Sequence, residues 1–167
     1  VLVPGASFPG GMRIVGLVSL TPRAMLYRVE SAGTPGDAVL KVLRTPSHGE
    51  SPEALFPVLR VRHPSVVEAF RAGRGPDGLP FVLMAYLQGE TLRDRLAREG
   101  PFEPARAIDL ATDLAEGLSA LHRAGIVHGS LGAEAAFLVR TPGRHGRLSA
   151  RLLDFPPASP IRTRADD

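Results

Sequence analysis

The chain has 167 residues, 44% of them hydrophobic and 22% charged, a composition that excludes a disordered chain and fits one domain or two small lobes. It contains no cysteine, which excludes disulfide bonds and thiolate metal sites and agrees with a reducing compartment. No apolar run approaches the roughly 18 residues of a membrane span and no signal peptide is visible, so we expect a cytoplasmic location.

The formal net charge of +3 makes a nucleic-acid partner one alternative. The arginines are interleaved with Asp and Glu from Arg13 to Arg164 and form no block of like charge. The pattern therefore favours a solvated surface over a nucleic-acid interface. A nucleic-acid binder would show an affinity that falls steeply with salt.

The first part of the chain is predicted to form a sheet, after a Gly/Pro-rich lead-in over residues 1–12. Short apolar and β-branched segments between turn residues are typical of strands. Five such segments occur, in RIVGLV, AMLYRVE, AVLKVLR, SVVEAFRA and LPFVLMAYL. We therefore expect a five-stranded, mainly antiparallel sheet.

One short helix is predicted between the third and fourth strands. Ser51 is a suitable N-cap, and Pro52 suits the first helical position. Pro57 is expected to limit this helix, because a proline inside an α-helix removes a hydrogen bond and clashes with the preceding turn.

After residue 87 the pattern changes to that of helices. GETLRDRLAREG is predicted to form a helix that begins at Thr91 and ends at Gly100. A longer helix is expected from Pro104 to His122, with an apolar stripe that needs a partner surface. The stripe consists of Ala107, Ile108, Ala111, Leu114, Ala115, Leu118 and Leu121. AAFLV and ARLLDF then predict a small hairpin, and residues 157–167 a flexible tail.

Four motifs occur in the order and spacing of one known family. They are AVLKVLR, RHPSVVEAF, FVLMAYLQGETLRDRLAREG, and IVHGSLGAEAAFLV followed by LLDF. On these motifs the chain resembles the first part of a bacterial Ser/Thr protein kinase domain. The resemblance implies an α+β, protein kinase-like fold, with an N-lobe over residues 13–87 and a partial helical C-lobe with the catalytic-loop hairpin over residues 88–156.

The resemblance also implies which residues would meet ATP and Mg²⁺. Lys41, the only lysine in the chain, matches the strand lysine that holds the α- and β-phosphates of ATP. The position of the family's glutamate partner falls on Ala54, so Glu53, one residue away, would pair with Lys41 only if the short helix is shifted. Asp154 matches the aspartate that holds magnesium. The adenine pocket would consist of Ala38, Met84, the backbone groups of Ala85 and Leu87, and Phe137.

Each of these positions has a structural alternative. A single lysine at position 41 is compatible with chance in an arginine-rich chain. Glu53 is compatible with a first-turn glutamate favoured by the helix dipole, and Asp154 with a polar residue that ends a strand.

The loop that covers the phosphates departs from the family pattern. The three glycines of that loop fall on Ser19, Thr21 and Ala24, with Pro22 between them. Glycine lets backbone N–H groups approach phosphate oxygens, whereas side chains block this approach and proline lacks the N–H. The sequence therefore predicts poor phosphate binding by this loop.

The catalytic loop departs further. Ser130 occupies the position of the catalytic aspartate, Gly132 that of the lysine, and Ala135 that of the metal-binding asparagine. A serine hydroxyl cannot act as the base, because its pKa lies far above 7. His128 and Phe155 match residues that pack inside the family's fold, so packing is kept while catalytic groups are lost.

Three hypotheses follow. The first is a catalytically inactive kinase-like signalling module, a pseudokinase, with weak ATP binding and with a protein partner or a second copy that covers its truncated helical lobe. The second is a working ATP-dependent Ser/Thr protein kinase or a fragment of one. The third is an arginine-rich nucleic-acid binder.

Overall fold

The computed structural model describes residues 1–44, 52–140 and 147–153, with the backbone alone for residues 52–55. The described chain forms two compact units. The first consists of Val1–Leu59 with Glu68–Tyr86, and the second of Arg60–Val67 with Leu87–Asp167.

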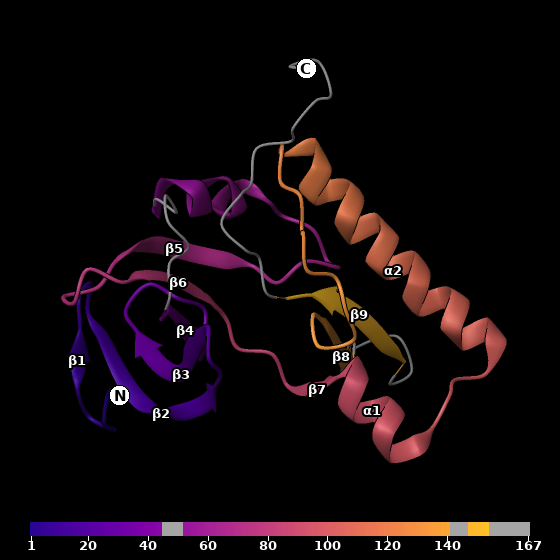
Figure 1. The fold of residues 1–167 in the computed structure, drawn as a ribbon, viewed down its shortest axis with the longest axis horizontal. Coiled ribbons are helices and arrows are strands. Elements are labelled where there is room, and N and C mark those ends of the chain that lie inside the picture. The colour runs from indigo at the N-terminus through magenta and orange to yellow at the C-terminus, as the bar shows by residue number, and fades with distance from the viewer. Residues whose placement is uncertain (45–51, 141–146, 154–167) are drawn as a thin grey trace. The chain divides into compact units, whose positions relative to one another are not determined.

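The first unit is a six-stranded sheet with the order β1-β2-β3-β4-β6-β5 (Figure 1). Every pair of neighbouring strands is antiparallel. The strands are β1 (Ser7–Phe8), β2 (Met12–Leu20), β3 (Ala24–Ser31), β4 (Ala38–Leu43), β5 (Ala69–Arg74) and β6 (Pro80–Ala85). The predicted hairpin around Thr-Pro and the predicted hairpin around Asp77-Gly78 are both present.

One hydrophobic cluster of this unit lies on one face of the sheet. Side chains alternate between the two faces of a strand, and the core takes Ala38, Leu40 and Val42 from β4. Phe8 and Phe81 meet edge to face in the same core, with ring centroids 5.2 Å apart. All six residues of β4 are buried, so both faces of this strand are covered.

Two features of this unit differ from the expectation. The sheet has six strands rather than five, because the two-residue strand β1 pairs with Arg13 and Met12. The predicted helix begins at Pro52 as expected but is a 3₁₀ helix, η1 (Pro52–Arg60), that continues past Pro57. The steric rule against an interior proline applies to the α-helix, and the 3₁₀ helix has a different hydrogen-bond pattern and a tighter winding.

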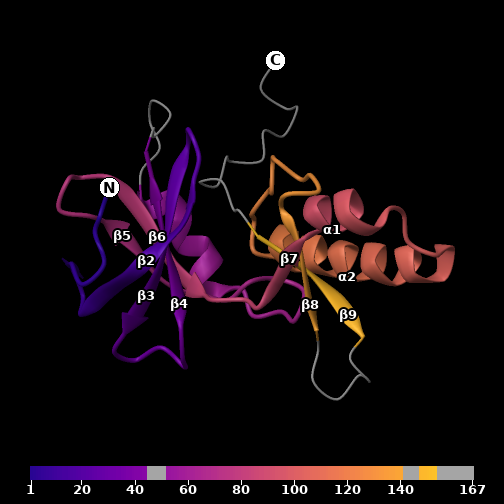
Figure 2. The same cartoon turned by 90° about the horizontal axis from the view of Figure 1, so that it is seen from below.

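The second unit combines two helices with a three-stranded antiparallel sheet (Figure 2). The helices are α1 (Leu92–Glu99) and α2 (Pro104–Arg123), and the strands, in the order β7-β8-β9, are β7 (Gly89–Thr91), β8 (Ala136–Arg140) and β9 (Leu148–Leu152). The predicted hairpin is β8 with β9, and β7 is an addition. None of the described helices is both long and apolar enough to cross a bilayer.

Helix α1 has the ends that the sequence predicts. The Thr91 hydroxyl accepts a hydrogen bond from the Asp94 N–H at 3.1 Å, so it satisfies one of the free donors at the helix start. Gly100 follows the last helical residue with φ of 73°, a conformation that glycine adopts without strain.

Helix α2 lies where it was predicted, but its buried face matches the predicted stripe only in part, at Leu114 and Leu121. Its buried residues are Leu110, Gly117, Ala120 and Leu121, whereas most of the predicted stripe, Ala107, Ile108, Ala111 and Ala115, is exposed. A close approach at Gly117 and a hydrogen bond of Asp113 distinguish this face. A side chain on Gly117 would lie 2.7 Å from the Ser65 carbonyl oxygen, and the Asp113 carboxylate accepts a hydrogen bond from the Ala150 N–H of β9 at 2.9 Å.

Candidate functional site

Lys41 lies in the middle of β4, opposite Leu26 of β3 and Val82 of β6. Its residue exposure is 8%, and its side chain points to the face opposite Leu40 and Val42, because side chains alternate along a strand. Lysine is rarely so buried. Lys41 is therefore a buried residue of the sheet, unlike an ordinary lysine on the surface.

Three predicted adenine-pocket residues lie in the same unit as Lys41. Ala38 and Ala85 face each other in register on β4 and β6, and Met84 lies opposite Val39. All but Ala85 are buried. The Ala85 N–H donates to the Glu68 carbonyl oxygen at 2.9 Å, so this N–H is used within the unit.

The other predicted residues of that pocket belong to the second unit. Leu87 is half-buried, and Phe137 lies on β8 opposite Thr91 and Arg151. Because the predicted pocket takes residues from both units, its assembly stays a prediction.

Two predicted ligands lie outside the described part of the chain. Asp154 and the neighbouring Phe155 fall in the undescribed residues 154–167, and only the backbone of Glu53 is described. Among the described residues, no three His, Asp or Glu side chains gather as a metal site would require. The assignments of Glu53 to Lys41 and of Asp154 to magnesium therefore stay predictions.

Polar groups of the turn between β2 and β3 form hydrogen bonds with each other. The Thr21 N–H donates to the Ala24 carbonyl oxygen at 2.9 Å, and the Ala24 N–H donates to the Thr21 hydroxyl oxygen at 3.0 Å. Pro22 has no N–H. Two of the three backbone donors from Thr21 to Ala24 are thus engaged inside the turn.

The segment predicted to be the catalytic loop is anchored by His128. This histidine has an exposure of 2%, and its Nε2 lies 2.8 Å from the Leu153 carbonyl oxygen. Because a carbonyl only accepts hydrogen bonds, Nε2 is the donor. The Leu153 N–H in turn donates to the Ala135 carbonyl oxygen at 2.7 Å. Both ends of the loop are therefore tied to the residue after β9.

The side chains on this loop carry few reactive groups. Ser130 is exposed, and its N–H donates to the His128 carbonyl oxygen at 2.8 Å. Ala135 has an exposure of 3% and presents only a methyl group. Glu134 supplies a carboxylate, but it forms an ion pair with Arg93 of α1.

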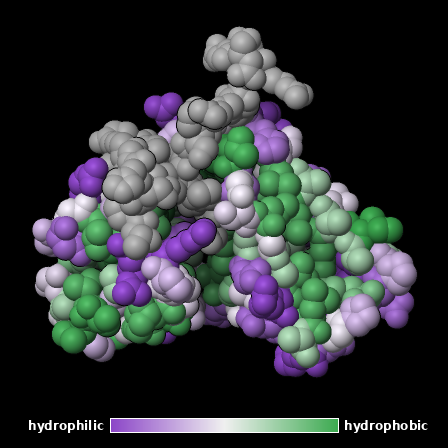
Figure 3. Space-filling view, viewed as in Figure 1, coloured by the Kyte–Doolittle hydropathy of each residue, from purple (hydrophilic) through white to green (hydrophobic). Residues whose placement is uncertain are grey.

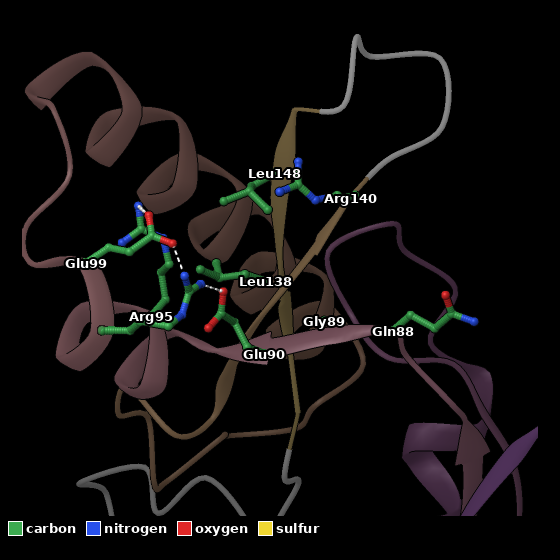
Figure 4. A pocket seen from close by; sticks show the side chains of 9 residues that line it. Gln88, Gly89, Glu90, Arg95, Glu99, Leu138, Arg140 and Leu148 are labelled. Carbon is green, nitrogen blue, oxygen red and sulfur yellow. Dashed lines mark hydrogen bonds and ion pairs between the residues drawn. The ribbon is translucent and has the colours of Figure 1, made fainter.

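A cavity of about 530 Å³ lies within the second unit, and the sequence reasoning did not identify it (Figure 4). Leu138 and Leu148 are its apolar lining residues, and its charged lining residues are Glu90, Arg95, Arg98, Glu99 and Arg140. The i, i+4 spacing of Arg95 and Glu99 was the available signal, but the position of Arg140 beside α1 depends on tertiary structure.

The charges on the α1 side of the cavity are paired. Arg98 donates to Glu90 at 2.5 Å and also pairs with Glu99, and Arg95 pairs with Glu99 at 2.6 Å. The hydrogen bond to Glu90 is the main reason why the pKa of the Arg98 guanidinium is raised. Two guanidinium groups and two carboxylates thus form one connected cluster.

The arrangement of the described chain is that of a protein kinase-like fold. It is similar to the crystal structure of the Mycobacterium tuberculosis PknI kinase domain, with a TM-score of 0.77 and 26% sequence identity over 95% of this chain and 64% of that one. No protein-family model matches the sequence.

Relatives found by sequence indicate the same class of protein. Over 95 residues the chain is 41% identical to the serine/threonine-protein kinase pkn2 of Myxococcus xanthus, covering 57% of this chain and 11% of the relative. It is 28% identical over 149 residues to pkn3 of the same organism, covering 86% of this chain and 27% of the relative. The chain is therefore a kinase-like domain with bacterial Ser/Thr protein kinases as relatives, and the predicted resemblance and fold are confirmed. It spans only a minor part of the length of these curated relatives.

Proposed function

We propose that this kinase-like domain does not transfer phosphate and acts by binding a protein partner. One observation carries the proposal. The loop from His128 to Ala135 is held at both ends by hydrogen bonds to Leu153, yet the positions that would carry out catalysis are occupied by Ser130, Gly132 and Ala135.

The missing groups have separate roles in phosphoryl transfer. An aspartate accepts the substrate proton and an asparagine holds a metal ion, while the other groups stabilise charge on the phosphate. Serine cannot accept the proton at neutral pH, and alanine has no donor atom for a metal. Restoring one of these groups would still leave the others absent.

The turn between β2 and β3 supports the same proposal. A phosphate-binding loop needs several backbone N–H groups that point at the ligand. In this chain the N–H groups of Thr21 and Ala24 are engaged within the turn, and Pro22 has none. We therefore expect weak nucleotide binding that depends mainly on Lys41.

The binding role is supported by the exposed face of α2. Ile108 on this face is 66% exposed, and Ala107, Ala111 and Ala115 are exposed beside it. Hydrophobic residues lie at the surface along the course of α2 (Figure 3). We propose that a protein partner or a second copy covers these exposed apolar residues.

The first test is phosphate transfer. We expect the purified chain, incubated with γ-labelled ATP, Mg²⁺ or Mn²⁺ and a general protein substrate, to incorporate label at the level of its Lys41→Met variant. An active bacterial Ser/Thr kinase domain assayed in parallel shows that the conditions support transfer. Label incorporation that requires Lys41 would overturn the proposal and favour an active kinase.

The second test is nucleotide binding, measured as the change in melting temperature. For a dissociation constant near 1 mM, about 1 mM ATP with Mg²⁺ would stabilise the fold by roughly 0.4 kcal/mol and raise the melting temperature by about 1 °C. Lys41→Met is expected to remove this shift. A shift of many degrees at micromolar ATP would contradict the expectation drawn from the turn at Pro22.

A further inference from the structure

Helix α2 carries a line of side chains that its own unit leaves largely uncovered. The line follows the alternating spacing of four and three residues that places side chains on one side of a helix, the a and d positions of a heptad. Leu118 in this line is half-buried and the others are exposed, with Ile108 at 66%. We call these residues the heptad line, and its members are Pro104, Ile108, Ala111, Ala115, Leu118 and His122.

The sizes of the side chains in the heptad line suit contact with another helix. Ala111 and Ala115 lie in the middle, and the larger Ile108 and Leu118 lie on either side of them. Two crossed helices are closest at one point and diverge on both sides of it, so small residues fit the centre of the contact and large ones its flanks. No charged side chain interrupts the line from Pro104 to Leu118, so a contact there buries no charge.

The same order of sizes makes the heptad line complementary to itself. In an antiparallel pair of α2 helices, a positions of one helix lie opposite d positions of the other. With Ala111 opposite Ala115 of a second copy, the spacing places Ile108 opposite Leu118 of that copy. Each of these contacts occurs twice in such a pair, because the two helices are identical. The pattern therefore fits a second copy of the same helix.

Charges at the two ends of α2 favour the antiparallel direction. Glu103 is the N-cap residue and Arg123 the last residue of the helix, and both are exposed. The register described above brings Glu103 opposite Arg123 of the second copy. A parallel pair would instead place each charge beside its like. One N–H of Arg123 donates to the Ser119 hydroxyl at 2.9 Å, and a guanidinium has four further donors for a carboxylate.

We propose that two copies of this chain associate through the heptad lines of antiparallel α2 helices. A surface that pairs with itself about a two-fold axis closes at two copies. The inference rests on the binding role proposed above and names the partner as a second copy. Each copy contributes one helix of 20 residues, about 30 Å long. This contact is small, so we expect a dissociation constant of about 100 µM and a mostly monomeric chain at a few micromolar.

Sedimentation equilibrium of the full chain between about 10 µM and 1 mM tests the association. The average mass is expected to rise with concentration toward that of two chains. Ile108→Asp should weaken the dimer by at least about tenfold, because each copy would bury a carboxylate against Leu118 of the other. Leu96→Asp is the control, since it places the same change at an exposed leucine of α1, and it should stay within about twofold. Melting curves check that both variants fold.

A charge exchange tests the direction and register of the pair. At low salt, Glu103→Arg alone and Arg123→Glu alone are each expected to weaken the dimer by about three- to tenfold, because each replaces two ion pairs with two contacts of like charge. The double variant Glu103→Arg with Arg123→Glu exchanges the charges and restores both ion pairs. Its dissociation constant is expected to return to within about twofold of the wild type.

Three outcomes would overturn the inference. They are a monomer at about 1 mM, a dimer that Ile108→Asp does not weaken, and a double variant that recovers no affinity. A monomer would contradict self-association and leave the proposed binding of another protein standing. Label incorporation that requires Lys41 would overturn the proposed lack of phosphate transfer without changing the dimer. The two failures are therefore distinguishable.

Discussion

The substitution Gly117→Ala is expected to destabilise the fold by about 1–3 kcal/mol, although alanine is the better helix former by about 1 kcal/mol. Gly117 lies inside α2 on the buried face. A Cβ atom there would lie 2.7 Å from the Ser65 carbonyl oxygen and 3.0 Å from a methyl carbon of Leu152. The leucine can turn away, but the backbone carbonyl moves only if the helix or the segment around Ser65 shifts.

The measurement is denaturant unfolding of the wild type and the variant, with Ala115→Gly as the control. Ala115 lies on the exposed face of the same helix, so its replacement reports helix propensity alone, at a cost of about 1 kcal/mol. Stabilisation by Gly117→Ala would show that the helix does not approach Ser65 this closely.

His128→Ala is expected to cost about 2–4 kcal/mol of unfolding free energy. The imidazole is almost fully buried and donates to the Leu153 carbonyl oxygen at 2.8 Å. Its removal leaves a cavity and a carbonyl without this donor. The loss is expected even though the domain is proposed to be catalytically inactive, because the role of His128 is to hold the loop.

His122→Ala is the control for this prediction. His122 lies in the last turn of α2 and is exposed, so its replacement should change stability by no more than about 1 kcal/mol, through the helix dipole. Equal effects of the two substitutions in thermal or denaturant unfolding would contradict the anchoring role of His128.

Local signals were sufficient to predict most elements of the fold. The ends of α1 depend on Thr91 and Gly100, which act within their own turns, and the two hairpins of the first unit depend on turn residues. The strands β1 and β7 were missed, because two or three residues carry no periodic pattern. In β7, Gly89 lies so close to the Leu138 carbonyl oxygen that a Cβ atom would clash with it.

The buried face of α2 was predicted only in part, correctly at Leu114 and Leu121 and incorrectly at the start of the helix. Hydrophobic spacing selected Ala107, Ile108 and Ala111 as the buried stripe, because periodicity counts apolar side chains. The helix instead buries the face with Gly117 and Asp113, where the absence of a side chain and one hydrogen bond to β9 permit close packing. Neither Gly117 nor Asp113 has a hydrophobic side chain, so hydrophobic spacing does not reveal this face.

The candidate site was predictable where single residue types carry the chemistry. The substitutions at Ser130, Gly132 and Ala135 were visible in the sequence, and so was the unusual Lys41. The cavity beside α1 depends on residues that are brought together by folding, so sequence patterns could not predict it. The hydrogen bonds between Thr21 and Ala24 are local, and the sequence indicated only that Pro22 has no N–H.

The second unit takes Arg60–Val67 from a part of the chain that lies between two segments of the first unit. Within it, the Leu152 N–H donates to the Ser65 carbonyl oxygen at 2.8 Å, and the Val67 N–H donates to the Leu152 carbonyl oxygen at 3.0 Å. Cleavage of one peptide bond therefore cannot release either unit whole. A fragment that starts at Leu87 would lack the peptide that borders β9, and adding residues 60–67 in trans should protect it against proteolysis.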